Sequence, residues 1–226
     1  MPVTFLTKEI VFPHPEEALE DGLLAVGGDL STERLLLAYR SGIFPWYSED
    51  SPILWWSPDP RMVLFPGDLK VSKSLRQKIN SDAFGVRFDF DFDSVIHHCA
   101  TVERKEQAGT WISSEMIKAY KELHSKGFAH SVETYLDGEL VGGLYGVSMG
   151  KAFFGESMFH LQADTSKIAL YHLVKKLKSW NFKLIDVQQE TSHLRSLGAM
   201  PVPREKFLVM LKTAIDQNPS PNTWKF

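Results

Sequence analysis

The chain has 226 residues, of which 43% are hydrophobic and 23% charged, with a formal net charge of −3 and an isoelectric point near 6.2. These values are typical of a globular protein with a full core, and they exclude a strongly basic nucleic-acid coat protein. No apolar run approaches the ~18 residues of a membrane-spanning helix, so we expect no membrane partner. The single cysteine, Cys99, cannot form an internal disulfide and favours a cytoplasmic location.

Residues 1–60 are rich in loops and turns, and we expect them to form a small N-terminal domain. The helix predicted here begins after Ser31, a favourable N-cap, and ends before Gly42. The following stretch, 42–61, reads GIFPWYSEDSPILWWSPDPR and predicts a short hairpin around a polar turn. It contains three of the chain's six tryptophans, which are Trp46, Trp55 and Trp56.

The aromatic hairpin predicts a rigid surface. Flat rings held on a stiff backbone are what proteins use to stack nucleobases. Packing between a small lobe and a larger one is the simpler alternative, and it fits the adjacent pair Trp55 and Trp56 better. Base stacking is therefore one use of this surface that the sequence allows.

Residues 61–226 are expected to form a larger domain that begins with three helices, over 72–80, 91–104 and 113–126. Ser72 is placed to cap the first of these helices. That helix carries three basic side chains that could contact an RNA backbone: Lys73, Arg76 and Lys78. A solvated helix face is the alternative explanation for this patch.

The clearest architectural pattern is a set of three apolar runs over 131–159, joined at Asp137-Gly138 and Met149-Gly150. Such turns predict an antiparallel meander. A long amphipathic helix over 166–180, a buried strand over 183–188 and two further helices follow, before a tail expected to be loosely attached. This order resembles the acyltransferase fold of the GNAT type. We therefore expect an α+β protein, with a small N-terminal α/β lobe followed by a GNAT-like domain that has a mixed, mostly antiparallel sheet.

The predicted strand 183–188, KLIDVQ, carries polar residues among apolar ones. Because side chains alternate along a strand, Asp186 and Gln188 should share one face, and Ile185 and Val187 the other. A buried carboxylate has to be hydrogen-bonded or functional, and an Asp186 that merely ties down a loop fits the pattern equally well. Glu156, within a predicted strand of large apolar residues, is a second acid of this kind.

The loop HLQADTSK, between the meander and the long helix, contains no glycine. An acetyl-CoA-dependent enzyme would place a glycine-rich turn here to hold the pyrophosphate at the helix N-terminus. We therefore expect an acyl donor other than acetyl-CoA, and no cofactor. His97, His98 and Cys99 are adjacent on a predicted helix, where neighbouring side chains diverge, so we expect no metal site.

Six strings occur in order between residues 22 and 207: GLLAVGGDL, GIFPWYSEDSPILWWSPDPR, GTWIS, ELVGGLYGVSMG, FFGESMF and LIDVQQETSHLRSLGA. Together they resemble the bacterial leucyl/phenylalanyl-tRNA–protein transferases. The resemblance implies transfer of Leu or Phe, and of Met less well, from aminoacyl-tRNA to the N-terminal Arg or Lys of acceptor proteins. The added residue would mark the acceptor for degradation by the N-degron route. We expect the protein to be a monomer.

Position by position, the resemblance implies Trp46 and Trp111 as the residues that bind the terminal adenosine, and Asp186, Gln188 and Glu156 as catalytic residues. It also implies six apolar residues around the donor side chain: Leu144, Phe153, Met158, Leu170, Leu173 and Ile185. Two of them depart from the family, because Leu144 stands where Met is frequent and Leu173 where an aromatic can occur. Leu is less pliable than Met, so the order of preference among Leu, Phe and Met stays open.

The chemistry expected of these groups is attack on an ester by an α-amine with a pKa of about 8. Such a nucleophile needs positioning more than it needs a strong base. We expect Gln188, oriented by Asp186, to accept a hydrogen bond from the amine, and Glu156 and Asp186 to attract the cationic acceptor. Two other functions fit parts of the sequence: a module that binds RNA ends without catalysis, and an acetyl-CoA-dependent N-acetyltransferase.

Overall fold

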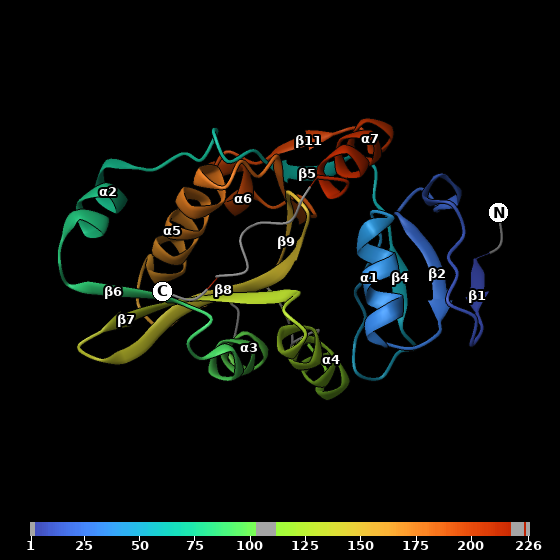
Figure 1. Ribbon diagram of the computed structural model, residues 1–226, viewed down its shortest axis with the longest axis horizontal. Coiled ribbons are helices and arrows are strands. Elements are labelled where there is room, and N and C mark those ends of the chain that lie inside the picture. The colour runs from blue at the N-terminus through green and yellow to red at the C-terminus, as the bar shows by residue number, and fades with distance from the viewer. Residues whose placement is uncertain (1–2, 103–111, 218–223, 225–226) are drawn as a thin grey trace.

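The computed structural model describes residues 3–102, 112–217 and 224. Trp111, one of the two residues expected to bind adenosine, lies outside the described residues. The described strands form two separate sheets, a small one near the N-terminus and a larger one that carries most of the helices (Figure 1). No helix in the described part of the chain is long and apolar enough to cross a bilayer.

The N-terminal sheet has four short strands: β1 (Thr4–Leu6), β2 (Leu23–Gly27), β3 (Phe44–Pro45) and β4 (Leu54–Trp56), in the order β1-β2-β4-β3. A 3-10 turn, η1 (Pro15–Glu17), precedes β2, and α1 (Thr32–Arg40) follows it. Ser31 Oγ accepts a hydrogen bond from the Arg34 amide at 3.4 Å, and Gly42, just past the helix, has a φ of 73° that only glycine adopts without strain. β3 and β4 pair antiparallel, so the predicted hairpin is confirmed.

The larger sheet has the order β11-β5-β10-β9-β8-β7-β6. Its strands are β5 (Arg61–Leu64), β6 (Phe84–Phe88), β7 (Ala129–Leu136), β8 (Glu139–Met149), β9 (Ala152–His160), β10 (Leu184–Gln188) and β11 (Met200–Val202). The predicted meander is β7–β8–β9. Neighbouring strands pair antiparallel except β9 and β10, which are parallel, so the sheet is mixed and mostly antiparallel, as the sequence predicts.

Helices cover both faces of the larger sheet (Figure 1). On one face lies α5 (Thr165–Ser179), with α2 (Lys73–Asn80) packed beside it. On the other face lie α3 (Phe92–Thr101) and α4 (Ser114–Ser125), and α7 (Arg204–Ile215) packs against both β9 and α1. The short α6 (Ser192–Ser196) follows β10. The predicted helices are all present, with ends that differ by a few residues.

Two apolar cores result from this layering. The larger core runs from the N-terminal sheet, through Trp55 and Tyr39, to Phe154 and the helices on that face of the larger sheet, so the two sheets share one interior. The smaller core lies under α5 and includes Phe153. It also includes Trp224, which is only 7% exposed, so the expectation of a loosely attached tail is wrong for that residue.

A buried ion pair connects the two parts of the protein. The guanidinium of Arg61, the first residue of β5, donates from Nε and Nη2 to the two carboxylate oxygens of Asp186 on β10, each at 2.8 Å. Its Nη1 donates to the carbonyl oxygen of Gly42 at 3.1 Å, just past the end of α1. The Arg61 guanidinium also lies 4.6 Å from the ring centre of Phe44 and 4.8 Å from that of Phe207. Both charged side chains are at most 1% exposed.

We predict that Arg61→Met lowers the free energy of unfolding by about 3–5 kcal/mol, because it leaves the Asp186 carboxylate buried without its counter-charge. The double variant Arg61→Met/Asp186→Leu should recover much of this loss, since two apolar side chains then replace the pair. Equilibrium urea denaturation of the three proteins measures both effects. A single variant that loses less than about 1 kcal/mol, the value of an exposed pair, would contradict this view of the ion pair.

Candidate active site

The site forms where two parallel strands diverge. β9 and β10 pair only from Ala152 to Phe154 and from Leu184 to Asp186, although β9 continues to His160. Beyond that point a cavity of about 240 Å³ opens between the two strands. This volume lies below the ~300–1,000 Å³ typical of small-molecule sites, which suits part of a ligand better than a whole cofactor.

Both strands carry a β-bulge at the point of divergence. On β9, Glu156 has no partner on β8, because Ser157 pairs with Tyr145 and Gly155 with Gly146. A bulge leaves one residue unpaired and turns its side chain away from the regular alternation, and it is frequent beside active sites. Glu156 can therefore reach both the cavity and the helices on the far face of the sheet.

The bulge on β10 changes the expected alternation. Asp186 pairs with Val63 and Gln188 with Met62, so Val187 is the extra residue, and Gln188 has a φ of 63°. Ile185, Val187 and Gln188 all line the cavity, whereas Asp186 does not. The expectation that Gln188 faces away from Ile185 and Val187 is thus wrong, because regular alternation ends at the bulge.

The floor of the cavity is apolar. All six residues expected around a donor side chain line it: Leu144, Phe153, Met158, Leu170, Leu173 and Ile185. They come from β8, β9, α5 and β10, four elements that the sequence order alone does not bring together. The polar lining includes Glu156 and Gln188, together with Gln189, Thr191 and His193.

Glu156 is the centre of a buried hydrogen-bond network. Its Oε2 accepts a hydrogen bond from the Tyr120 hydroxyl of α4 at 2.9 Å, and its Oε1 accepts one from Gln188 Nε2 at 3.0 Å. The Tyr120 hydroxyl is in turn hydrogen-bonded to that of Tyr39 on α1. Burial, and to a smaller extent the nearby Asp186 charge, raises the pKa of Glu156 to about 7, although these hydrogen bonds act in the opposite direction.

The network fixes the direction of the Gln188 amide. An ionised carboxylate can only accept hydrogen bonds, so the Nε2 group of Gln188 must face Glu156. Its Oε1 then points away from Glu156. Burial raises the pKa of Tyr39 and Tyr120 well above the usual value, and the negative charge of Glu156 is the second cause. Both hydroxyls therefore keep their protons.

Asp186 supports Gln188 through the backbone. One of its carboxylate oxygens, Oδ1, accepts a hydrogen bond from the Gln188 amide nitrogen at 2.9 Å as well as one from Arg61 Nε. Its side chain is fully buried and bound to Arg61. Asp186 therefore holds the bulged backbone in place, while Glu156 holds the Gln188 side chain. Neither Arg61 nor the two tyrosines is evident as a site residue from sequence, because their partners lie far away along the chain.

The three tryptophans of the hairpin occupy different positions. Trp46 and Phe44 both line the cavity. The Trp46 ring packs edge-on against the Trp56 ring, with 5.6 Å between ring centres. Trp56 Nε1 donates to the Trp46 carbonyl oxygen at 2.7 Å. Trp55 is fully buried, and its Nε1 donates to the Gly27 carbonyl oxygen at 2.8 Å. Trp56 thus packs directly against Trp46, while Trp55 is buried in the core and pairs with Pro45, the residue before Trp46.

The rim of the cavity includes residues that sequence reasoning did not assign. Gln189, Thr191 and His193 all line it. Partial burial, followed by the charges of Lys167 and His160, lowers the pKa of His193. Gln189, Thr191 and His193 come shortly after the predicted strand 183–188. That position in the sequence is the signal that could have identified them.

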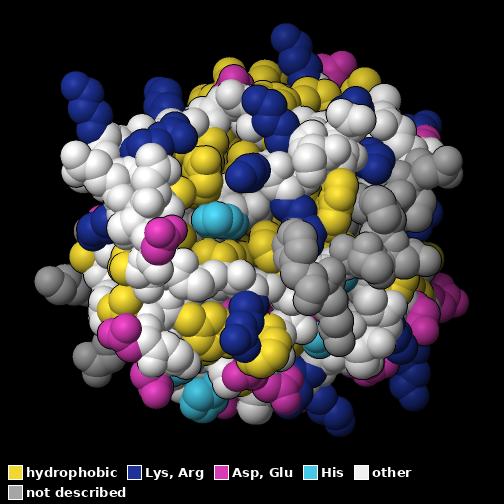
Figure 2. Space-filling view, turned by 60° about the vertical axis from the view of Figure 1, so that its left-hand side comes forward, with side chains coloured by type: hydrophobic (Ala, Val, Ile, Leu, Met, Phe, Trp, Pro, Cys, Tyr) yellow, Lys and Arg dark blue, Asp and Glu magenta, His cyan; other side chains and the backbone are white. Residues whose placement is uncertain are grey.

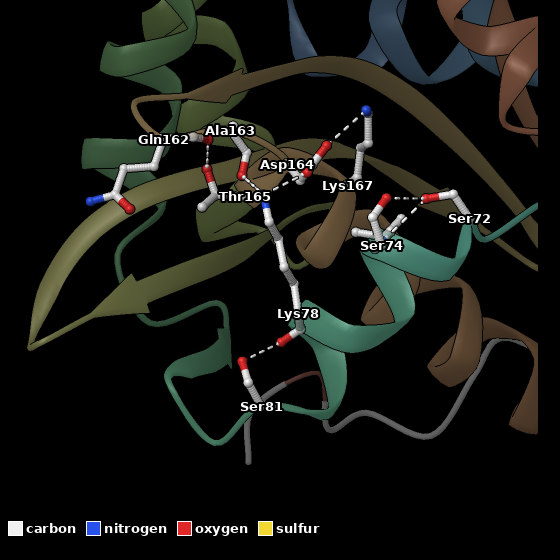
Figure 3. Close-up of polar contacts among 10 residues, drawn as sticks. Ser72, Ser74, Lys78, Ser81, Gln162, Ala163, Asp164, Thr165 and Lys167 are labelled. Atoms are coloured by element: carbon white, nitrogen blue, oxygen red, sulfur yellow. Dashed lines mark hydrogen bonds and ion pairs between the residues drawn. The ribbon is translucent and has the colours of Figure 1, made fainter.

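The basic patch on α2 is only partly available. Lys73 and Arg76 are exposed, whereas the ammonium of Lys78 binds the Asp164 carboxylate at 2.7 Å and the Ala163 carbonyl oxygen at 3.1 Å (Figure 3). Figure 2 shows the side of the molecule on which α2 and α5 lie. Lys and Arg side chains are spread over the upper part of this view, and acidic side chains lie mainly along its lower edge.

The same contact bears on the choice of acyl donor. Asp164 precedes α5, and its carboxylate also binds Lys167 at 2.9 Å, so it occupies the region at the helix N-terminus (Figure 3). Because Lys78 and Lys167 both bind this carboxylate, its charge is compensated, and the case against a pyrophosphate rests on the glycine-free loop before α5. Within residues 3–102, 112–217 and 224, no group of three His, Cys, Asp or Glu could hold a metal ion.

Solved structures that partly match this chain include L-PGS from Bacillus licheniformis, with a TM-score of 0.44 and 9% identity over 87% of this chain and 72% of that one. A ribosomal-protein-alanine N-acetyltransferase from Brucella melitensis gives a TM-score of 0.35 and 14% identity over 51% of this chain and 87% of that one. A GCN5-related N-acetyltransferase from Kribbella flavida gives a TM-score of 0.33 and 12% identity over 71% of this chain and 57% of that one. At these TM-scores the likenesses carry no argument about function.

The sequence relatives are far closer. The family profile described as leucyl/phenylalanyl-tRNA protein transferase matches residues 63–212, and that of its N-terminal domain matches 28–59. A protein named leucyl/phenylalanyl-tRNA–protein transferase from Syntrophobacter fumaroxidans is 55% identical over 100% of this chain and 96% of its own. A protein of the same name from Thermodesulfovibrio yellowstonii is 54% identical over 99% of this chain and 91% of its own. The chain belongs to the leucyl/phenylalanyl-tRNA–protein transferase family.

Proposed function

We propose that this protein transfers Leu or Phe, and Met less well, from aminoacyl-tRNA to the N-terminal Arg or Lys of acceptor proteins. The observation that carries the proposal is a mostly apolar cavity that is lined by the hydrogen-bonded pair Glu156–Gln188 and by Trp46. The full-length relatives carry the name of this activity. The new peptide bond would mark the acceptor for N-degron degradation, in the cytoplasm where charged tRNA is made.

The donor would bind with its side chain in the apolar floor and its terminal adenosine against Trp46. An apolar pocket separates side chains that differ by one methylene by only about 1–3 kcal/mol, so the shape of the wall must reject branched side chains. Trp111 stays a prediction for the second adenosine contact. The exposed Lys73 and Arg76 are the better candidates for tRNA backbone contacts, since Lys78 is bound to Asp164.

The reaction then needs a positioned amine. The acceptor α-amine attacks the ester carbonyl carbon, a carbon–nitrogen bond forms, and the bond to the 3′ oxygen of the tRNA breaks. Gln188 Oε1 faces away from Glu156, so it can accept a hydrogen bond from the attacking amine and align its lone pair. A neutral amide cannot keep the proton, which passes to the leaving 3′ oxygen, directly or through water.

The roles of the two acids differ. Asp186 is bound to Arg61 on both oxygens, so it is a positioning residue in this proposal and has little charge left to attract an acceptor. Glu156 lines the cavity itself, and its ionised form both orients Gln188 and attracts the cationic Arg or Lys. This changes the expectation that Asp186 orients the Gln188 side chain directly.

Two broader expectations remain proposals. We propose that the protein is a monomer. We also propose 1–60 and 61–226 as two domains, since the sheets separate between β4 and β5, although one core runs through both. The acetyltransferase alternative is disfavoured by the glycine-free loop that leads into α5. No observation favours an RNA-end-binding module without catalysis.

We predict that the protein, incubated with Leu-tRNA and a peptide that begins with Arg, adds one leucine to the peptide's α-amine, as measured by mass spectrometry. Gln188→Leu should lower kcat/KM by about 10²-fold or more, because the hydrogen bond to the amine is lost, while tRNA binding is retained. Gln162→Leu is the matched control, since its side chain points away from the neighbouring contacts (Figure 3).

Three outcomes are informative. An unmodified peptide would show that the proposed activity is wrong. Tight CoA binding in a thermal-shift experiment would instead support the acetyltransferase. Full activity of the Gln188→Leu variant would refute the role given to that amide, but not the activity itself.

We also predict how the rate depends on pH. With a pKa of about 7, Glu156 is ionised above that pH and protonated below it. The ionised form accepts the stronger hydrogen bond from Gln188 Nε2 and supplies the charge that attracts the acceptor. Protonation of the amine, with its pKa of about 8, slows the reaction in the same direction. Below pH 7, log(kcat/KM) should therefore rise with a slope approaching about 2 in the wild type and about 1 in Glu156→Gln. Equal slopes for the two proteins would contradict the role of Glu156.

A further inference from the structure

Trp224 is a buried aromatic residue next to the wall of the cavity. Its ring stacks on His130 of β7, with 4.0 Å between ring centres and 10° between planes. It also packs against the rings of Phe153 and Trp180, with 5.9 Å and 5.2 Å between ring centres, respectively. The neighbouring Lys176 of α5 donates from its ammonium to the Trp224 carbonyl oxygen at 2.8 Å. Ring and backbone are thus both held.

The contact with Phe153 connects Trp224 to the cavity. Phe153 is fully buried and lines the cavity, whereas Trp224 does not line it. The Phe153 ring also lies against Gly146 of β8, where an added Cβ would come within 2.5 Å of Cε1. The ring is therefore packed against strand backbone on β8 and against the indole of Trp224, and it has little room to turn away from the cavity.

His130 stacks on a face of the indole. Its Nδ1 is hydrogen-bonded to the buried Asp89 carboxylate at 2.7 Å, which fixes the imidazole plane against which Trp224 stacks. Asp89 accepts a second hydrogen bond from the Ser131 amide at 2.8 Å. Since protein interiors are close-packed, a wall residue backed by such a fixed group moves little when a ligand presses on it.

We propose that Trp224 is a specificity-determining residue: by backing Phe153, it limits the depth of the cavity and hence the size of the donor side chain that is transferred. The inference rests on the proposed function, and it assigns a role in donor selection to a residue near the C-terminal end of the chain. Removal of the indole leaves space into which the Phe153 ring can turn, and the cavity deepens.

The test compares donors in the full-length protein. Transfer of tryptophan from Trp-tRNA to an Arg-starting peptide is measured against transfer of leucine, by mass spectrometry with each donor limiting. Trp224→Ala should raise the ratio of tryptophan to leucine kcat/KM by about 10-fold or more, the range that one or a few methylenes give in an apolar pocket. Trp224→Phe, which keeps an aromatic backing, should shift the ratio in the same direction but less.

Leu24→Ala is the control for a loss of stability alone. Leu24 is buried in the other core, so this variant should lower the melting temperature without changing the donor ratio. If both Trp224 variants keep the wild-type ratio while they transfer leucine, the inference is overturned and the proposed function stands. If the wild type transfers no leucine, both are overturned.

Discussion

Arg61 carries its positive charge in a place from which water is excluded, and the surrounding groups are arranged to balance it. Asp186 takes two of its hydrogen bonds and the Gly42 carbonyl oxygen a third, while two aromatic rings cover the guanidinium. An ion pair of this kind adds little net stability over apolar packing, but loss of one partner is costly. It therefore restricts the geometry: β5, β10 and the end of α1 have to meet at one point.

The site follows from that restriction. Asp186 also binds the amide nitrogen of Gln188, so the ion pair fixes the bulge at which β10 leaves β9. The second bulge, on β9, brings Glu156 to the side chain of Gln188, and Tyr120 and Tyr39 extend the network to α1. The N-terminal part thus contributes to the site twice, through Tyr39 behind Glu156 and through Trp46 beside the cavity. Groups held in this way need little reorganisation when a substrate binds.

Local patterns predict much of the fold. Helix caps such as Ser31 and Ser72, and the Asp137-Gly138 turn, depend on neighbouring residues and were confirmed. The short strands β5, β6 and β11 were not predicted, because three to five residues next to proline or glycine carry little periodicity and depend on their partners. The face of Gln188 was predicted wrongly for a similar reason, since a bulge is set by the pairing of Asp186 with another strand.

Some residues around the cavity could be predicted from the sequence, and others could not. The resemblance to a known family gave the six apolar residues, and all of them line one cavity. Their supports could not be found from sequence, because each depends on a contact across the chain: Arg61 with Asp186 is separated by 125 positions, and Tyr39 with Tyr120 by 81. Trp224 is a further case, since its tail has the composition of a loose segment.

The central claim is that the donor lies in this cavity with its ester carbonyl beside the Gln188 amide oxygen. A crystal structure with leucyl-adenosine, in which a 3′ amide replaces the labile ester, tests it directly. The account predicts the leucine side chain among Phe153, Leu170 and Ile185, the adenine against Trp46, and Gln188 Nε2 still bound to Glu156. A ligand bound outside the cavity, or a Gln188 amide turned away from the carbonyl, would contradict the account.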